Sequence, residues 1–113
     1  MSTRQNTDYG YEIQKVYLEM MMTDAETFVR CQAVFNPEAF DRRLQDGARF
    51  LHEYVTEHNA MPTFDMINAA TQVDIRHPGD LQESHYDWLL LEFETFSRHK
   101  ALEAAILKGA DLL

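Results

Sequence analysis

The sequence has little of several residue types, and each shortage excludes a class of protein. Cys31 is the single cysteine, which excludes an internal disulfide and fits a reducing compartment. No apolar run approaches the roughly 20 residues of a membrane-spanning helix, and the first ten residues contain no signal-peptide core. The four glycines are isolated, so no glycine-rich phosphate loop is present; they are Gly10, Gly47, Gly79 and Gly109. We therefore expect a cytoplasmic protein without membrane contact.

Basic residues are scarce as well. Ten Lys and Arg residues stand against 19 Asp and Glu residues, which gives a net charge of −9. Nucleic-acid affinity comes mainly from neutralising phosphates, so a domain this acidic should not bind a polyanion directly. Arg42, Arg43 and Arg49 form the one local concentration of basic residues, and acidic residues surround them.

The apolar residues recur with helical spacing, and no stretch alternates with the two-residue period of a strand. With 113 residues, of which 45% are apolar, the chain can form one folded domain with one core. The pattern predicts an all-α protein, a small bundle of five to six helices. We expect a disordered polar tail over 1–7, a helical head over 8–74, a loop over 75–84 and a long helix over 85–113.

The clearest helix signals lie between Phe35 and Thr63. Asn36 is a good N-cap and Pro37 suits the first helical position, so a turn of helix and then a long helix should follow. The long helix should stop at Asn59, because Pro62 prevents simple continuation. Thr63 should then open a short helix from Phe64 to about Thr71.

The flanking segments carry weaker signals. A first helix should begin at Asp8 or Tyr9, and Thr23 with Glu26 forms a capping-box pattern for a second helix that ends near Val34. The stretch from Thr71 to Ser84 is rich in helix breakers and predicts a loop with at most one helical turn. The final helix should then reach at least Lys108.

Residues with catalytic or metal-binding chemistry do not form a convincing site. Cys31 lies on an apolar helix, where a lone cysteine is usually a small core residue. His77, His85 and Asp87 are best interpreted as exposed polar residues rather than metal ligands. Arg49, Glu53 and Glu57 follow one another at i, i+4 spacing and are expected to form solvated surface pairs. The sequence therefore predicts no catalytic, cofactor-binding or metal site, and it favours a core role for Met20, Met21 and Met22 over an adaptable partner surface.

The last helix has apolar residues on more than one face, which indicates deep burial or contact with another chain. Its candidate protein-interface residues are Trp88, Leu89, Leu91, Phe93 and Phe96. If these side chains pair with a second copy, Leu89→Lys should lower the solution mass. The chain ends at Leu112 and Leu113 with no stop signal, which suggests a truncated chain or a helix that continues into a further segment.

The order of these motifs resembles the N-terminal domain of hexameric DnaB-type replicative helicases. The phrase from Phe35 to Phe40 is followed by a helix with small and aromatic core positions, and Met61-Pro62-Thr63 then opens a short helix. The final helix, His85 to Gly109, is similar to that of the replicative helicases of T-even-type phages, and the resemblance covers about Glu12 to Gly109. One departure is that Thr71 to Ser84 is too short for the first arm of the helical hairpin that bacterial members carry.

The resemblance implies a non-enzymatic part of an ATP-dependent helicase. Such domains form a collar above the motor ring, set the oligomeric state (dimer or hexamer) and help to recruit primase and the helicase loader during DNA replication. ATP and Mg²⁺ would belong to a motor domain beyond Leu113, with no cofactor in this chain. A stand-alone helical adaptor without a motor remains the alternative, followed by the helicase-binding domain of a primase and, last, a small enzyme using Cys31.

Overall fold

The computed structural model describes residues 9–111, so the expected tail over 1–7 and the last two leucines lie outside the described residues. Within this range the chain is all-α and contains no strand, as the apolar spacing predicts. Five α-helices and two short 3₁₀ helices follow in the order α1 Tyr11–Met21, α2 Ala25–Cys31, η1 Gln32–Val34, η2 Pro37–Ala39, α3 Arg42–His58, α4 Phe64–Thr71 and α5 Glu83–Asp111.

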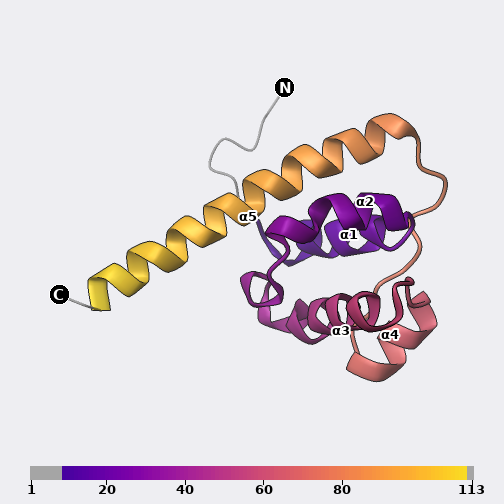
Figure 1. Cartoon of the computed structure of the whole chain (residues 1–113), viewed down its shortest axis with the longest axis horizontal. Helices are drawn as coiled ribbons and strands as arrows, with labels where there is room; N and C mark the ends of the chain where they lie inside the picture. Colours follow the sequence, from indigo (N-terminus) through magenta and orange to yellow (C-terminus); the bar gives the residue numbers. More distant parts are fainter. Residues whose placement is uncertain (1–8, 112–113) are drawn as a thin grey trace.

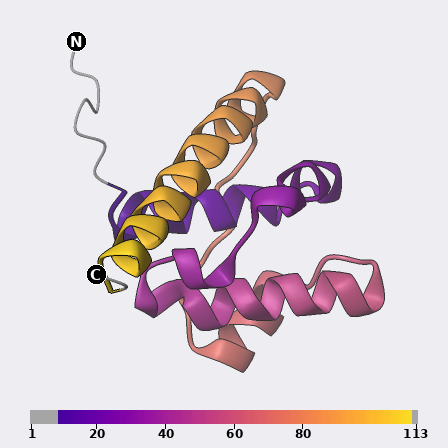
Figure 2. The ribbon, with the colours of Figure 1, turned by 60° about the vertical axis from the view of Figure 1, so that its left-hand side comes forward.

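The helices form three layers (Figure 1). α5 lies on one side, α1 and α2 form the middle, and α3 with α4 forms the other side; Figure 2 shows the same order from a second direction. The first half of α5 packs on α1 and α2, while its last turns extend beyond the other helices. No described helix combines the length and the apolar character that crossing a membrane requires.

The turn before α3 has the predicted caps but a different geometry. Asn36 Oδ1 accepts from the Glu38 amide at 3.1 Å, yet the turn that follows Pro37 is the 3₁₀ helix η2 and ends at Ala39. Phe40 is extended, with φ −80° and ψ 161°, and its side chain is buried. Asp41 then caps α3 by accepting from the Arg43 amide at 2.9 Å. The predicted turn is therefore η2 and the predicted long helix is α3. The extended residue Phe40 separates them, and its ring packs into the core.

The end of α3 and the bounds of α4 match the prediction. Asn59 closes α3 in the left-handed conformation, with φ 53°, a geometry that Asn tolerates better than most residues. Thr63 Oγ1 accepts from the Met66 amide at 3.1 Å and caps α4. Local capping chemistry is sufficient to place both boundaries.

The predicted capping box of α2 is wrong. The N-cap is Asp24, and Thr23 instead donates its hydroxyl hydrogen to the Met20 carbonyl at 2.7 Å. The same hydroxyl lies 2.6 Å from the hydroxyl of Tyr86 on α5. Thr23 is therefore engaged by a contact between helices distant in sequence, and Glu26 pairs with Arg30 at 3.0 Å.

The core is an aromatic cluster with methionines around it. The ring of Phe93 lies 5.7–6.0 Å from the rings of Tyr17, Phe35, Phe40 and Phe96. Offset and edge-on contacts at these separations stabilise a core beyond the burial of area alone. The three consecutive methionines are all buried, as predicted; they are Met20, Met21 and Met22.

The segment 72–82 contains no helix and is nevertheless anchored. Val73 and Ile75 are buried, and Asn68 on α4 holds the backbone of Ile75 by donating to its carbonyl at 2.8 Å and accepting from its amide at 3.0 Å. Gly47 on α3 makes room for this segment, because a Cβ there would meet Val73 Cγ1 at 3.0 Å. These contacts therefore hold the 72–82 segment in place as it connects the layer of α3 and α4 to α5.

Candidate functional site

The five apolar residues predicted as an interface on α5 divide between core and surface. Leu89, Phe93 and Phe96 are 0%, 1% and 0% exposed, so these three candidate interface residues are buried in this chain's own core, the deep burial that the apolar pattern also allows. They face α1 and α2 because their side chains complete the aromatic core of this same chain. Trp88 and Leu91 remain at the surface, with 39% and 68% of their areas exposed.

Hydrogen bonds and ring contacts fix the first half of α5 to the head. Tyr17 donates to Glu92 Oε1 at 3.1 Å, and the Tyr17 ring lies 6.2 Å from that of Trp88. Because Leu89 is enclosed here, Leu89→Lys would put a charge in the core and unfold the domain rather than test self-association.

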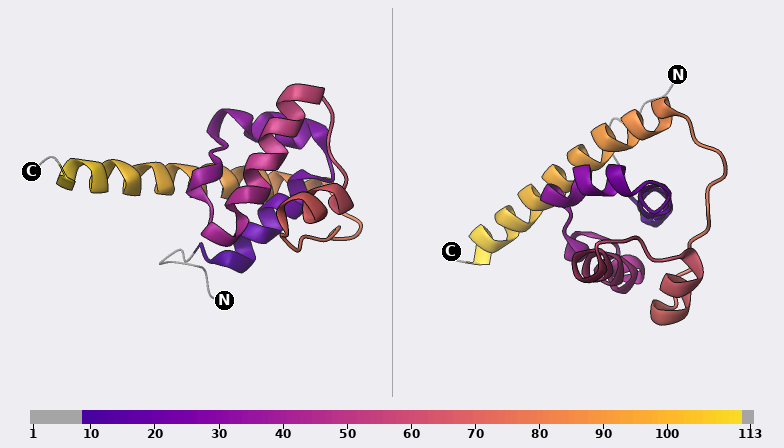
Figure 3. Two further views of the ribbon diagram at one scale, coloured as in Figure 1. Left: turned by 90° about the horizontal axis from the view of Figure 1, so that it is seen from below. Right: turned by 45° about the vertical axis from the view of Figure 1, so that its right-hand side comes forward.

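The second half of α5 is an arm. Every residue from Ala101 to Gly109 is exposed, whereas Lys100 is still half-buried. Leu102, Ile106 and Leu107 are 60%, 61% and 67% exposed. Figure 3 shows this part of the helix standing free of the other elements. The arm therefore begins within α5 rather than at residue 85, and the preceding turns belong to the head.

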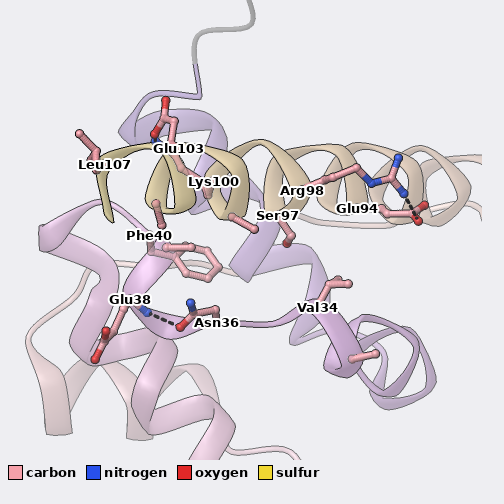
Figure 4. Close-up of a pocket in the computed structure, with 14 residues that line it drawn as sticks. Val34, Asn36, Glu38, Phe40, Glu94, Ser97, Arg98, Lys100, Glu103 and Leu107 are labelled. Carbon is pink, nitrogen blue, oxygen red and sulfur yellow. Dashed lines mark hydrogen bonds and ion pairs between the residues drawn. The ribbon is translucent and has the colours of Figure 1, made fainter. Parts of the chain in front are cut away.

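A groove runs between the arm and the head (Figure 4). Its volume is about 680 Å³. The segment around η1 and η2 contributes both apolar and polar residues of the head: Ala33, Val34, Asn36, Glu38, Ala39 and Phe40. α5 contributes a face of mostly small side chains with charged neighbours: Glu94, Ser97, Arg98, Lys100, Ala101, Glu103, Ala104 and Leu107.

The charged side chains that α5 contributes to this groove are paired along the helix, and Glu38 adds a further carboxylate from the head. Arg98 contacts Glu94 at 2.7 Å, and Lys100 contacts Glu103 at 3.5 Å. The four side chains are all at least 29% exposed, so these pairs add little to stability. Between these pairs the groove is lined by small apolar side chains, namely Ala39, Ala101 and Ala104.

A second, smaller hollow of about 250 Å³ lies between α1, the 72–82 segment and the start of α5. It is lined by Val16, Met20, Leu81 and Trp88, with Glu19 and His85 among them. Burial raises the pKa of Glu19, although its carboxylate accepts from the Arg76 amide at 2.8 Å. Sequence reasoning did not identify this hollow, because it depends on how the 72–82 segment folds back onto α1.

The remaining chemically active side chains have structural roles. Cys31 is buried, and burial raises the pKa of its thiol to about 11, so the thiol stays protonated at neutral pH and is a weak nucleophile. His77 Nδ1 accepts from the Gly79 amide and His85 Nδ1 from the Gln82 amide, at 3.0 and 2.9 Å. Among residues 9–111 no group of His, Cys, Asp or Glu side chains is arranged to hold a metal ion.

The expected surface pair of Arg49 with Glu53 is not formed. Arg49 contacts Asp46 at 3.1 Å, three positions earlier on α3. Pairs three or four residues apart can both form on a helix surface. An exposed Arg can change from one such partner to the other at little cost in free energy.

Comparisons of the chain with protein-family models, with curated proteins and with solved structures found no match. What α5 does must therefore follow from its own geometry and chemistry. Its arm combines exposed apolar residues with a groove against the head, and this combination is the strongest functional feature of the described residues.

Proposed function

We propose that the chain is an oligomerisation and protein-interaction domain, and that the arm of α5 is the element through which it assembles. The observation that carries this proposal is the exposure of Leu102, Ile106 and Leu107 on a helix that extends past its own core. Large aliphatic side chains concentrated on a projecting segment are typical of a surface that another chain covers.

The energetics favour a partner for the arm. Fully burying a leucine or isoleucine side chain contributes roughly 1.5–3 kcal/mol. The arm needs little ordering on binding, because it continues a helix whose first half is fixed in the aromatic core through Phe93 and Phe96. A preformed helix loses less conformational entropy on association than a segment that folds as it binds.

More specifically, we propose that this domain is the N-terminal collar of a phage-type replicative DNA helicase. The order of the Phe35–Phe40 phrase, the Met61–Thr63 connection and the His85–Gly109 helix supports this assignment. The net charge of −9 also fits it, since a collar contacts proteins while a motor domain holds DNA. Catalysis, with ATP and Mg²⁺, would then belong to a separate motor domain, and primase and the helicase loader would be partners.

Breaking the arm tests the general proposal. Ala105→Pro should disrupt α5 beyond the head, because proline in a helix interior costs about 3 kcal/mol. By light scattering, the unmodified chain should exceed its monomer mass of 13.2 kDa as concentration rises, and Ala105→Pro should stay near that mass. Ala105→Ser is the matched control and should behave like the unmodified chain. A constant 13.2 kDa for the unmodified chain would contradict self-association.

The helicase assignment needs its own test. The reading frame after the codon for Leu113 should continue into a phosphate-binding loop, and the primase of the same genome should bind the domain in biolayer interferometry. A stop codon at that position, together with no primase binding, would exclude the collar and leave a stand-alone adaptor.

A further inference from the structure

Three elements enclose the smaller hollow: one face of α1, the 72–82 segment and the first turns of α5. Its volume is about 250 Å³, and its polar lining residues are Glu19 and His85. The other walls are apolar and are formed by Val16, Met20, Pro78, Leu81 and Trp88. Pockets for drug-sized ligands usually exceed about 300 Å³, so this hollow suits one large side chain better than a whole cofactor.

Glu19 places a carboxylate among these apolar walls and leaves one of its oxygens without a partner. Oε2 accepts from the Arg76 amide at 2.8 Å, whereas Oε1 has no hydrogen-bond partner among residues 9–111. The guanidinium of Arg76 contacts a different carboxylate, that of Asp74, at 3.3 Å. Lys15, one turn earlier on α1, forms no ion pair with Glu19 in the part of the chain that the structure describes. The carboxylate is therefore partly desolvated without a cation beside it to offset the cost.

Trp88 presents an aromatic surface to the same hollow. Its side chain is 39% exposed, and its one printed ring neighbour, Tyr17, lies 6.2 Å away at 51°, so part of the indole remains uncovered. Among aromatic side chains, the indole attracts cations most strongly. His85 Nδ1 accepts from the Gln82 amide at 2.9 Å, which requires this nitrogen to be unprotonated, so His85 adds no positive charge here.

The chain that borders the hollow is acidic. Residues 74–88 contain one basic side chain, Arg76, and four acidic ones that are all exposed, namely Asp74, Asp80, Glu83 and Asp87. A surface with charges of one sign draws groups of the opposite sign toward it and repels groups of its own sign. The apolar walls, the carboxylate of Glu19 and this acidic border together fit a group with an aliphatic stem and a positively charged end.

We propose that this hollow binds an arginine side chain presented by a partner protein. The aliphatic stem of the arginine lies along Val16, Met20 and Leu81. Its guanidinium donates to Glu19 Oε1 and stacks on the indole of Trp88. Arginine suits these two contacts better than lysine, because a planar guanidinium both stacks on an aromatic ring and donates two parallel hydrogen bonds to a carboxylate. Arginine is also enriched among the residues that dominate the affinity of protein interfaces.

A pair of peptides tests the recognition of charge. Trp88 is the single tryptophan, so its indole N–H gives one peak in a proton–nitrogen NMR spectrum and reports on this hollow. The peptide acetyl-Leu-Arg-Leu-amide should shift this peak in a saturable manner. The same peptide with citrulline in place of arginine keeps the shape and lacks the charge, so it should bind about tenfold more weakly or less. Equal affinity for the two peptides would overturn the arginine assignment.

Free arginine amide distinguishes a presented side chain from a small molecule. It should bind more weakly than the arginine peptide, because it lacks the flanking residues that cover the border of the hollow. If the two bind equally well, the hollow takes a free guanidinium compound and the proposed protein partner is wrong. A shift of the indole peak with the concentration of the chain alone would identify a second copy as the occupant and would also overturn the proposal.

Glu19→Gln tests the carboxylate. The variant keeps an acceptor for the Arg76 amide and removes the charge, so it should weaken binding of the arginine peptide about tenfold while the 72–82 segment stays in place. Glu57→Gln is the matched control: it makes the same change of charge on α3, at a side chain 77% exposed, and should leave binding unchanged. Unchanged affinity in Glu19→Gln would show that the guanidinium does not contact this carboxylate and would overturn the proposed site.

The hollow does not depend on the proposed assembly through the arm, and Ala105→Pro separates the two. Ala105 lies 17 residues beyond Trp88, about 25 Å along the helix, so the variant should bind the arginine peptide with unchanged affinity even where it no longer associates. Loss of peptide binding in Ala105→Pro would place the binding site on the arm and overturn the hollow as its location. A monomeric unmodified chain that binds the peptide would contradict self-association alone.

Discussion

The hydroxyl of Tyr17 on α1 donates a hydrogen bond of 3.1 Å to the carboxylate of Glu92 on α5, 75 positions later in the chain. The Tyr17 side chain is fully buried, and its ring also contacts those of Phe93 and Phe96. Tyr17 therefore contributes both a hydrogen bond and ring packing to the position of α5 on the head.

Removing that hydroxyl should destabilise the fold moderately. Tyr17→Phe keeps the buried ring and removes the donor, so we expect the free energy of unfolding to fall by about 0.5–1.5 kcal/mol in urea denaturation. Glu92 is partly exposed, so water can replace the lost donor and limit the cost. Tyr54→Phe, on α3 away from α5, is the control. No loss at Tyr17 relative to this control would show that the bond does not hold α5.

Two neighbouring positions on α5 should respond very differently to truncation. Phe93→Ala removes the ring at the centre of the aromatic cluster and should cost about 3–5 kcal/mol. Leu91→Ala changes a side chain that is 68% exposed, so the unfolding free energy should change by less than about 0.5 kcal/mol. Chemical denaturation of both variants measures this contrast, and similar losses would contradict the packing of α5 described above.

Asp41 should make part of the stability sensitive to acid. The side-chain and backbone hydrogen bonds from Arg43 lower the pKa of Asp41 to about 2. A lowered pKa in the folded state stabilises the fold above the unfolded pKa of about 4, and this contribution is lost as the pH falls toward 2. Asp41→Ala should cost about 0.5–2 kcal/mol at pH 7, since it removes the cap of α3.

Asp41→Asn separates the two roles of this side chain. It keeps an acceptor for the Arg43 amide but cannot ionise, so its unfolding free energy should depend less on pH between about 4 and 2 than that of the unmodified chain. Thermal unfolding at several pH values in this window measures the difference. Parallel profiles for the two proteins would argue against the lowered pKa.

Glu19 should change the pH dependence of stability in the direction opposite to Asp41. Its raised pKa means that the folded state takes up the proton more readily than the unfolded state. The fold is therefore stabilised as the pH falls through the folded pKa of Glu19, and this effect ends below the unfolded pKa of about 4.3. Glu19→Gln keeps an acceptor for the Arg76 amide and removes the buried charge.

The stabilities of the two proteins at pH 7 and at pH 5 test the predicted effect of Glu19. Glu19→Gln should be more stable than the unmodified chain at pH 7, and the difference should shrink at pH 5. The urea midpoints of both proteins at each pH give the measurement. A variant that is less stable at pH 7 would mean that the ionised carboxylate is needed to hold the 72–82 segment.

The helix boundaries set by nearby residues were predictable from the sequence. Thr63 caps α4 with its own hydroxyl, and Asn59 ends α3 through its own left-handed backbone, so neither depends on distant contacts. The all-α class followed from helical spacing in the same way. These features depend on interactions between residues a few positions apart.

The features that were missed depend on residues far apart in the chain. Thr23 could cap α2 in isolation, but it contacts Tyr86 on α5. Gln14 is buried because it accepts from the Asp41 amide at 2.6 Å, a partner 27 positions away. On α5, apolar residues lie on several faces, and only packing against α1 and α2 decides that Leu89 is core and Leu91 is surface.

The length of α5 makes the position of the arm sensitive to the core that supports it. From Phe96 to Asp111 the helix extends about 22 Å, at about 1.5 Å per residue. At that distance, a tilt of about 10° at the aromatic cluster would move the tip by about 4 Å, which is more than the rise of two helical residues. A conservative change in the core, such as Phe96→Leu, should thus displace the arm without altering any of the arm's own residues.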